Sequence, residues 1–363
     1  MTPRMRLSLT GSNAPFPTNR WITFIWCLLA SLGTFLMVAG CDGPPAPKLI
    51  NSIDSTNPAG KVQFSPDGTI LVIQDGGDGL IVWDVNGRRI KSRFNKVARV
   101  SVDFAFTADG KRLILGDISK VRALDLATGH SVVLYGHDGD VNCVACSPNG
   151  QIIASSHSKG NVKLWDPVAG KQLSTFHGEA AIDQLVFSPD STTLVAGGGT
   201  VVVPTFGCIW LWHVGEMDKK PRTLKEGYVH PVNVLALSPD GKALATPGEA
   251  EDVWLWDIQQ EKIKAKWKPG FKVMDAITFS PDGRTLLVGG GDGNTFRGLN
   301  FNPGKVAFFD TATGKKLHTL DALDDLVRCV AVSPDGKLLA VSNDGSLKTV
   351  KIWDVSSIIN RAP

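Results

Sequence analysis

The chain lacks a net charge once its amino terminus is set aside. Its 363 residues include 38 Lys or Arg and 35 Asp or Glu, and residues 1–40 hold three Arg and no acidic residue. The rest of the chain therefore carries 35 basic and 35 acidic side chains. A neutral body has no broad positive field to attract a phosphate backbone. Nucleic acid is therefore not expected as a partner.

The sequence also lacks the short motifs of common catalytic and metal sites. It contains neither a G-x-S-x-G nucleophile turn nor a P-loop, and its seven His are scattered without ligand spacing. A glycine-rich stretch at 289–294 invites a phosphate or calcium site, but no helix is predicted after it, and its acidic alternation ends at Phe296. We expect a strand-connecting loop there, no metal, no cofactor and no enzymatic activity.

Cysteine is sparse and suggests no disulfide framework. Two of the six Cys lie in the N-terminal segment, which leaves Cys143, Cys146, Cys208 and Cys329. Cys143 and Cys146 have the spacing of a redox or metal pair, but an odd separation within a strand places them on opposite faces. Cys329 occupies the same repeat position as Cys143. We expect these thiols to pack as small hydrophobic groups.

Helical periodicity is absent as well, and a repeated turn takes its place. Pro presets φ in such a turn, Asp or Asn accepts the next conformation, and Gly supplies φ > 0 at the exit. The Ser or Thr positions that open the turns are 42, 40, 41, 50, 42 and 53 residues apart. The seven tetrapeptides are Ser65–Gly68, Thr107–Gly110, Ser147–Gly150, Ser188–Ser191, Ser238–Gly241, Ser280–Gly283 and Ser333–Gly336.

Each turn separates two short apolar runs, and a third and a fourth run follow. The third run ends in a large side chain and a polar one: Trp83-Asp84, Leu124-Asp125, Trp165-Asp166, Trp212-His213, Trp256-Asp257, Phe309-Asp310 and Trp353-Asp354. Four short strands per unit predict an all-β repeat. A period near 40–45 with a Trp-Asp ending resembles the WD40 family over all seven copies. The resemblance implies a seven-bladed β-propeller over residues 48–356, with four antiparallel strands per blade and a C-terminal tail at 357–363.

The sequence departs from the WD40 pattern in one respect. Only Gly136-His137 matches the Gly-His pair of the family, and the fifth copy has Gly227-Tyr228 instead. The Asp of the family's buried hydrogen-bond network would fall at Lys159 in the third copy. We therefore expect this His-Ser-Trp-Asp network to be largely absent, and apolar packing to hold the ring.

The closing strand of the ring can also be predicted. Nine residues remain after Asp354, and they are few and polar for a fourth strand. Residues 48–53 precede the first inner strand. We expect this N-terminal segment to be the outer strand of the seventh blade.

The amino terminus has a basic segment followed by an apolar one, as in a secretory signal. Residues 21–40 hold no charge, and the run ends in Val38-Ala39-Gly40-Cys41. This ending resembles the lipobox of bacterial lipoproteins. It implies a signal peptide over 1–40, a lipidated Cys41 with a Pro-rich tether over 41–47, and a body outside the cytoplasm in the bacterial cell envelope. The alternative is an uncleaved transmembrane anchor, since twenty apolar residues can span a bilayer.

Two insertions and the channel mouth define a candidate binding rim. The fourth and sixth copies are longer between their second and third strands, and the insertions carry Phe206, Phe296, Arg297, Asn300 and Phe301. Insertions on one face of a repeat protein often mark its binding face. The inner strands should begin at the channel mouth with Gly60, Val102, Asn142, Asp183, Asn233, Asp275 and Arg328.

These features together predict a function only at the level of the fold. We expect a membrane-tethered, non-catalytic platform that binds unknown envelope proteins, since WD40 proteins commonly work in this way. A propeller enzyme with a channel-bound metal or cofactor and a lipoprotein subunit of an envelope assembly complex are the alternatives.

Overall fold

The computed structural model describes residues 45–360 except for short gaps at 77, 98–102, 138, 158–159, 178–179, 201–205, 217–218, 225–227, 229, 294, 297–298, 301–302 and 344–347. Residues 44–363 form one compact unit, and residues 1–43 form a separate one. The predicted signal segment over 1–40 and Cys41 thus lie outside the described residues.

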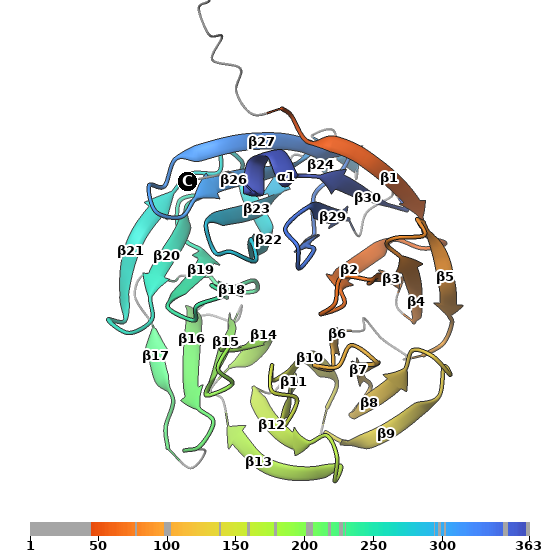
Figure 1. The fold of residues 1–363 in the computed structure, drawn as a ribbon. Coiled ribbons are helices and arrows are strands. Elements are labelled where there is room, and N and C mark those ends of the chain that lie inside the picture. Colours follow the sequence, from red (N-terminus) through yellow and green to blue (C-terminus); the bar gives the residue numbers. More distant parts are fainter. Residues whose placement is uncertain are drawn as a thin grey trace, which may run out of the picture. The chain divides into compact units, whose positions relative to one another are not determined.

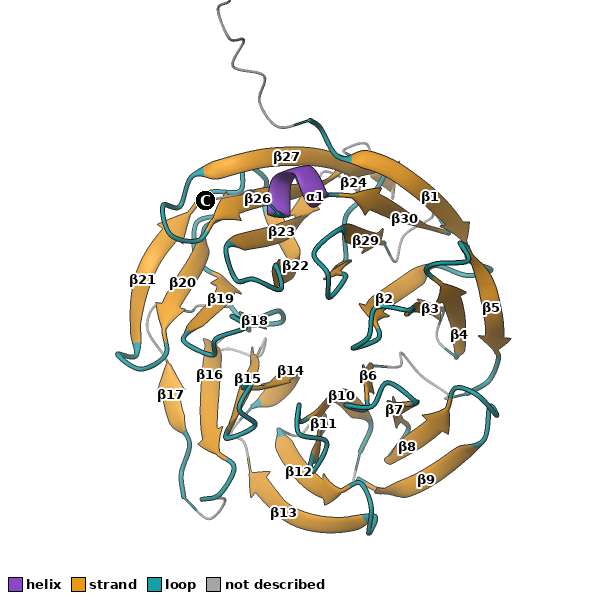
Figure 2. Cartoon of the chain, viewed as in Figure 1, coloured by secondary structure: helices purple, strands orange, loops and turns teal. Residues whose placement is uncertain are grey.

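The described chain forms seven four-stranded antiparallel sheets arranged as blades in a ring (Figures 1 and 2). Blades one to three hold, from the inside outward, β2 (Ala59–Phe64), β3 (Ile70–Asp75), β4 (Gly79–Asp84) and β5 (Arg89–Phe94); β6 (Phe104–Phe106), β7 (Arg112–Asp117), β8 (Lys120–Asp125) and β9 (Ser131–Gly136); and β10 (Val141–Cys146), β11 (Ile153–His157), β12 (Asn161–Asp166) and β13 (Lys171–His177).

Blades four to seven continue in the same order. They hold β14 (Ala181–Phe187), β15 (Thr193–Thr200), β16 (Phe206–His213) and β17 (Arg222–Leu224); β18 (Ala236–Leu237), β19 (Ala243–Pro247), β20 (Val253–Asp257) and β21 (Lys262–Trp267); β22 (Val273–Phe279), β23 (Thr285–Gly291), β26 (Gly304–Asp310) and β27 (Lys316–Leu323); and β28 (Cys329–Val332), β29 (Leu338–Ser342), β30 (Thr349–Asp354) and β1 (Lys48–Asp54). The predicted seven-bladed propeller is confirmed.

The N-terminal strand closes the ring, as its sequence predicts. β1 is the outer strand of blade seven and pairs antiparallel with β30, from Lys48 opposite Asp354 to Asp54 opposite Thr349. Ile53 lies buried in a cluster shared by blades seven and one. β1 therefore completes the four-stranded sheet of blade seven.

The residues after β30 contribute more than a tail. Residues 357–359 belong to a one-turn helix, α1 (Ser356–Ile359), whose Ile358 and Ile359 are buried in a cluster of blades six and seven. The Ser357 hydroxyl also donates a 2.7 Å hydrogen bond to the carbonyl of Pro45. The segment is mostly polar, so its sequence did not indicate a structural role. Two buried isoleucines are nevertheless enough to dock a single helical turn.

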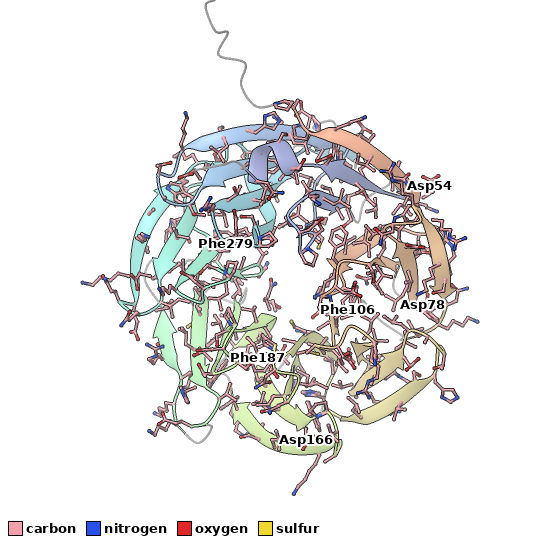
Figure 3. All side chains as sticks on the ribbon, in the orientation of Figure 1. Asp54, Asp78, Phe106, Asp166, Phe187 and Phe279 are labelled. Atoms are coloured by element: carbon pink, nitrogen blue, oxygen red, sulfur yellow. The ribbon has the colours of Figure 1, made fainter. Side chains whose placement is uncertain are left out.

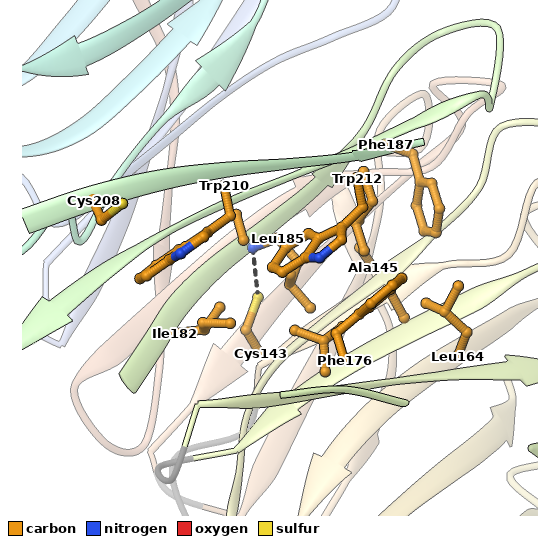
Figure 4. Close-up of a cluster of buried hydrophobic side chains, with 14 residues drawn as sticks. Cys143, Ala145, Leu164, Phe176, Ile182, Leu185, Phe187, Cys208, Trp210 and Trp212 are labelled. Atoms are coloured by element: carbon orange, nitrogen blue, oxygen red, sulfur yellow. Dashed lines mark hydrogen bonds between the residues drawn. The ribbon is translucent and has the colours of Figure 1, made fainter. Parts of the chain in front are cut away.

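Apolar side chains fill the space between neighbouring blades. The cluster between blades three and four includes Leu164, Phe176 and Trp212, and the rings of Phe176 and Trp212 stack with centroids 4.9 Å apart (Figure 4). Phe106, Phe187 and Phe279 close three of the inner strands, and Figure 3 shows them near the centre of the ring. Each blade thus buries its faces against its neighbours, as a closed ring permits.

The repeated tetrapeptides form the expected turns. In the fifth copy the amide of Gly241 donates to the carbonyl of Ser238 at 2.8 Å, and Gly241 has a φ of +73°. A Cβ there would lie 3.2 Å from Pro189 of the preceding blade. Ser191 takes the same place in the fourth copy with a φ of +63°. The turns therefore pack against one another around the rim opposite to the channel mouth.

Buried polar networks exist in two blades, so the expectation that apolar packing alone holds the ring needs correction. In blade three the Ser155 hydroxyl lies 2.6 Å from His137 Nε2 and accepts a 2.7 Å bond from Trp165 Nε1. In blade five the Tyr228 hydroxyl lies 2.6 Å from that of Thr246 and accepts a bond from Trp256 Nε1 at 3.0 Å. Tyr in the His position keeps a polar tip within reach, which the Gly-His pattern did not reveal.

Candidate functional site

A cavity of about 790 Å³ lies at the inner strands of the ring. Of the side chains predicted at the channel mouth, Asp183, Asn233, Asp275 and Arg328 line it, together with Gly60. Asn142 lines a neighbouring hollow of about 330 Å³ with Asp117, Asp140 and Asp183. Val102 lies outside the described residues. The structure thus brings the predicted mouth residues together.

A β-bulge at the start of the inner strand helps to place these side chains. The pairing skips a residue between Val141 and Cys143, between Ile182 and Gln184, and between Met274 and Ala276. The skipped residues are Asn142, Asp183 and Asp275. A bulge leaves its extra residue without a ladder partner and re-aims the side chain. The polar rim therefore depends on a repeated backbone irregularity.

One position further along, polar side chains join blade to blade from blade seven through blade one to blade five. We call Lys61, Asp103, Cys143, Gln184 and Cys329 the polar belt, since all five lie four residues before the Ser or Thr of their turn. Figure 4 shows one of its bonds, between Leu185 and Cys143. The contacts are Lys61 Nζ to Asp103 Oδ1 (2.6 Å), Val144 N to Asp103 Oδ2 (2.8 Å), Leu185 N to Cys143 Sγ (3.2 Å), Leu235 N to Gln184 Oε1 (3.3 Å) and Val62 N to Cys329 Sγ (3.4 Å).

The polar belt runs from blade seven through blade one to blade five and stops there. Blades five and six carry Val234 and Ala276 at the same position, and neither side chain has a polar atom. Between blades six and seven, Arg328 and Asp275 form a 2.7 Å ion pair one residue closer to the mouth. The repeat spacing could have revealed Lys61 and Asp103, but the sequence analysis considered only the first residue of each inner strand.

Burial sets the protonation of the channel groups. Burial raises the pKa of the Asp183 carboxyl group, because partial removal of water disfavours its charged form. Burial lowers the pKa of Lys61, but Asp103 and the two nearby thiols raise it by more, so the net shift is upward and the ammonium form persists. The channel therefore holds an ammonium group paired with Asp103 and, at its mouth, an exposed carboxyl group whose pKa partial desolvation raises.

The four cysteines in the described part of the chain are free thiols, as predicted. Cys143 and Cys208 are buried, whereas Cys146 and Cys329 are partly buried. Cys143 packs in the cluster between blades three and four and Cys146 against the one between blades two and three, which confirms their opposite faces. Burial raises the pKa of Cys143 and of Cys329, and it raises the pKa of Cys146 to about 12. Protonated thiols are poor nucleophiles and metal ligands.

The two insertions extend strands as well as loops. β15 runs to Thr200, which pairs with Phe206 at the start of β16, and Phe206 is 36% exposed. In blade six, β24 (Thr295–Phe296) and β25 (Leu299–Asn300) form a small separate hairpin. Nothing is described of the Phe296 and Asn300 side chains, and Arg297 and Phe301 lie outside the described residues.

The hairpins stand on the same rim as the channel mouth. The start of the inner strand pairs with the end of the second strand in both blades, with Ala181 opposite Gly199 and Val273 opposite Gly291. The predicted common face for the insertions and the mouth thus agrees with the strand pairing. Three aromatic side chains are predicted on this face. Phe206 is the one whose side chain the structure describes, and it is exposed.

The strand-connecting loop predicted at 289–294 begins later than expected, because residues 289–291 belong to β23. Gly198 lies within β15 and Gly290 within β23. A Cβ on Gly198 would lie 2.0 Å from the Ala181 carbonyl oxygen, and one on Gly290 would lie 1.8 Å from that of Val273. Glycine is required because two backbones approach closely. The hairpins are thus packed against their blades at their base.

The described residues contain neither a metal-binding cluster nor a membrane-spanning helix. Residues 45–360, outside their gaps, contain no group of three or more His, Cys, Asp or Glu that could hold a metal ion. Within the same described part, no helix has the length and apolar character needed to cross a bilayer.

Comparison with known sequences identifies WD40 repeats in three places. The family described as "WD domain, G-beta repeat" matches residues 129–166, 170–203 and 314–354. The first match begins just before β9 of blade two and ends at the last residue of β12 in blade three. A sequence repeat therefore joins the outer strand of one blade to three strands of the next.

Several animal proteins are similar to most of this chain. TBC1 domain family member 31 of Homo sapiens is 24% identical over 311 residues, which cover 83% of this chain and 28% of the relative. Apoptotic protease-activating factor 1 of Rattus norvegicus is 22% identical over 297 residues, with 81% and 22% covered. WD repeat-containing protein 1 of Xenopus tropicalis is 26% identical over 267 residues, with 70% and 39% covered. The chain thus spans less than half the length of these relatives.

Proposed function

We propose that this WD40 propeller is a non-catalytic platform that binds a protein partner on the rim around its channel mouth. The observation that carries the proposal is the shared face: the mouth with Asp183 and the exposed Phe206 of the blade-four hairpin lie on one rim. Exposed aromatic side chains are enriched at the centres of protein interfaces. The carboxyl group of Asp183 on this rim would suit a partner that offers Lys or Arg.

We further propose that the propeller is tethered to a membrane of the bacterial cell envelope through a lipid on Cys41. The uncharged run at 21–40 and the ending Val38-Ala39-Gly40-Cys41 support this location. The named relatives are animal proteins, so the support rests on the N-terminal residues alone. The Cys41→Ser variant should accumulate as an unprocessed precursor and should incorporate no labelled fatty acid. Normal processing and labelling of the variant would contradict the tether.

Cross-linking in living cells tests the binding rim. A photoreactive amino acid at Phe206 should capture a defined partner, and Asp183→Arg should abolish the cross-link without changing the melting temperature. The matched control places the same amino acid at Lys315, which is exposed in the turn before β27 on the opposite rim. Equal capture from both positions, or capture unaffected by Asp183→Arg, would exclude the rim as the binding face.

A channel enzyme remains the alternative from another class. It would require ligands that converge in the cavity, and Asp183 and Asp275 are the predicted carboxylates there. Asp275 is already paired with Arg328 at 2.7 Å. Metal analysis of the purified protein separates the two functions, because stoichiometric metal that is lost in Asp183→Asn would favour the enzyme.

A further inference from the structure

A groove of about 490 Å³ opens between blades three and four, beside the outer strand of blade three. We call it the blade-three groove, and its lining consists of Ile152, Leu164, Leu173, Ser174, Thr175, Val214 and Gly215. Ile152 ends the turn between β10 and β11, and Val214 directly follows β16. These turns belong to the rim opposite to the channel mouth. The groove is therefore separate from the proposed binding rim.

Two equivalent grooves of the ring have charged linings. One of about 550 Å³ lies between blades five and six, and one of about 390 Å³ lies between blades seven and one. Each is lined by five charged side chains, which are Asp240, Lys242, Asp257, Lys264 and Asp282 in the first and Asp67, Arg88, Asp335, Lys337 and Asp354 in the second. Among the residues that the structure describes, no charged side chain lines the blade-three groove.

The neutral lining results from the sequence of the third repeat. Its turn has Asn149 where the other six turns have Asp, and Gln151 where four of them have Lys or Arg. Residues 147–152 therefore form the one turn of the seven without a charged side chain. Leu173 stands where blades one and five have Lys91 and Lys264. Charge is thus missing from one groove at three separate repeat positions.

A β-bulge presents Leu173 at the groove. The pairing of β13 with β12 skips this residue, and a bulge leaves its extra residue without a ladder partner. Blades seven, two and six skip Ile50, Leu134 and Leu317 in the same way, and all three are partly buried against apolar clusters. Leu173 is 52% exposed. The propeller thus covers an aliphatic side chain at this position in three blades and leaves it open in blade three.

The outer strand beside the groove can also pair with an added strand. β13 is the outermost strand of its sheet, and Figure 1 shows it on the outside of the ring. One side of its backbone therefore presents unpaired N–H and C=O groups. Lys171 and His177 lie at its two ends, and the five residues between them carry no charge. An extended segment that pairs with such an edge places alternate side chains into adjacent pockets.

The size and polarity of the groove define its occupant. Seven residues line it, whereas a stable interface between folded proteins takes roughly 20–30 residues from each side. This favours a short segment over a second copy of the chain. A charged side chain would lose its hydration in the groove without gaining an opposite charge from the lining. Glu216 and Lys219, just beyond Gly215, pair with each other at 2.8 Å. The segment should therefore be uncharged and aliphatic where it meets the groove.

We propose that the blade-three groove binds an extended segment of a partner protein, which adds to β13 and inserts aliphatic side chains beside Leu173. The groove and the channel mouth lie on opposite rims, so both can be occupied at once. The propeller then joins two partners. Binding at the groove does not require the proposed site at the mouth, so either can fail while the other holds.

Selection from a random heptapeptide library against the purified full-length protein tests the proposal. The library is first depleted on the Leu173→Lys variant, which should fold because blades one and five carry Lys at this position. Peptides then recovered on the wild type should carry aliphatic residues at alternating positions and no charge between them. Recovery of no peptide, or of charged peptides, would overturn the proposal.

Two further variants show where the recovered peptides bind. Ile152→Ala imitates Ala243 of blade five and should weaken their binding roughly tenfold, since burial of one aliphatic side chain has an effect of this size. Val132→Lys is the matched control, because it puts the same charge on an exposed aliphatic residue of β9, outside the groove. It should leave binding unchanged.

Melting curves verify the folding of each variant, and Val214→Thr, which imitates Thr311 of blade six, replaces Ile152→Ala if that variant fails to fold. Equal weakening by Val132→Lys, or no weakening by the groove variant, would overturn the proposal. Sedimentation velocity of the wild type and of Leu173→Lys tests the other occupant. A dimer that depends on Leu173 would show that a second copy fills the groove, and the proposed partner segment would then be wrong.

Discussion

The two halves of the inner ring hold their blades together by different means. From blade seven through blade one to blade five, the polar belt makes hydrogen bonds or an ion pair to the next blade. Between blades five, six and seven, Val234 and Ala276 stand in its place, and apolar clusters fill both junctions. One repeat position can therefore join blades through polar or through apolar contacts. Four variants test this difference between the junctions, and they are given in order of decreasing effect on stability.

The largest effect should come from opening the seam where the polar belt crosses from blade seven to blade one. Deletion of residues 48–53 removes the buried Ile53 and exposes Val350 and Ile352, which are at most 3% exposed. Each of these three buried aliphatic side chains contributes about 1.5–3 kcal/mol, so we expect a loss of about 4.5–9 kcal/mol in the free energy of unfolding. Denaturant unfolding followed by Trp fluorescence measures it. An unchanged midpoint would mean that β1 does not hold the ring.

Breaking the ion pair of the belt should have the next largest effect. Asp103→Ala leaves the Lys61 ammonium and the Val144 amide without their partner. The side chains are 32% and 16% exposed, so water relieves part of the cost, and we expect a loss of about 2–3 kcal/mol. The double variant Lys61→Met with Asp103→Leu imitates blades five and six and should recover about half of the loss, because it removes the unpaired ammonium group but leaves the Val144 amide without an acceptor. A double variant as unstable as the single one would show that the apolar solution cannot replace the polar one here.

A single neutral contact of the belt should matter less. Gln184→Val gives blade four the side chain that blade five has and leaves the Leu235 amide unpaired. An unpaired buried donor costs about 1–2 kcal/mol. Exchange of the Leu235 amide hydrogen, measured with the stability of the variant, should become faster. Unaltered exchange would mean that the 3.3 Å contact does not form in solution.

The smallest effect should come from the rim ion pair that joins blades six and seven. Arg328 and Asp275 are 41% and 26% exposed, and exposed pairs contribute about 0.2–1 kcal/mol. Arg328→Ala should therefore cost less than about 1 kcal/mol, and the difference should vanish in 1 M NaCl. Thermal unfolding at low and high salt compares the two proteins. A larger loss of stability that persists in salt would show that this ion pair replaces the polar belt between blades six and seven.

Several features of the fold could be predicted from local patterns. The seven turns follow from tetrapeptides such as Ser238–Gly241, in which each residue suits its own backbone conformation. The closing strand followed from the count of strands, because only one segment was left to pair with β30. The common rim of Asp183 and Phe206 followed from strand direction. The turns depend on neighbours in the chain and the rim on strand direction, whereas the closing strand pairs residues from opposite ends of the repeats and followed from the strand count.

Other features could not be predicted because they depend on segments distant in sequence. Residues 289–294 suggested a loop, yet Gly290 lies in a strand where the Val273 carbonyl excludes a side chain, as the Ala181 carbonyl does at Gly198. Tyr228 showed no relation to Thr246 and Trp256 until the blade brought the three together. The placement of α1 depends on an apolar cluster of blades six and seven. A contact between distant residues leaves no fixed spacing in a single sequence.

The sequence by itself determined the number of blades, the turn chemistry and the order of strands, because a repeat with a period near 40–45 residues must bury each blade against the next. Only the tertiary structure decided how neighbouring blades are joined. Asp103 meets Lys61 and Val144, and Cys143 meets Leu185, across sequence separations of 41 or 42 residues. Such bonds form because ring closure brings equivalent positions of adjacent blades within hydrogen-bond distance. Whether a polar or an apolar side chain occupies each position then decides whether a hydrogen bond or an apolar contact joins the two blades.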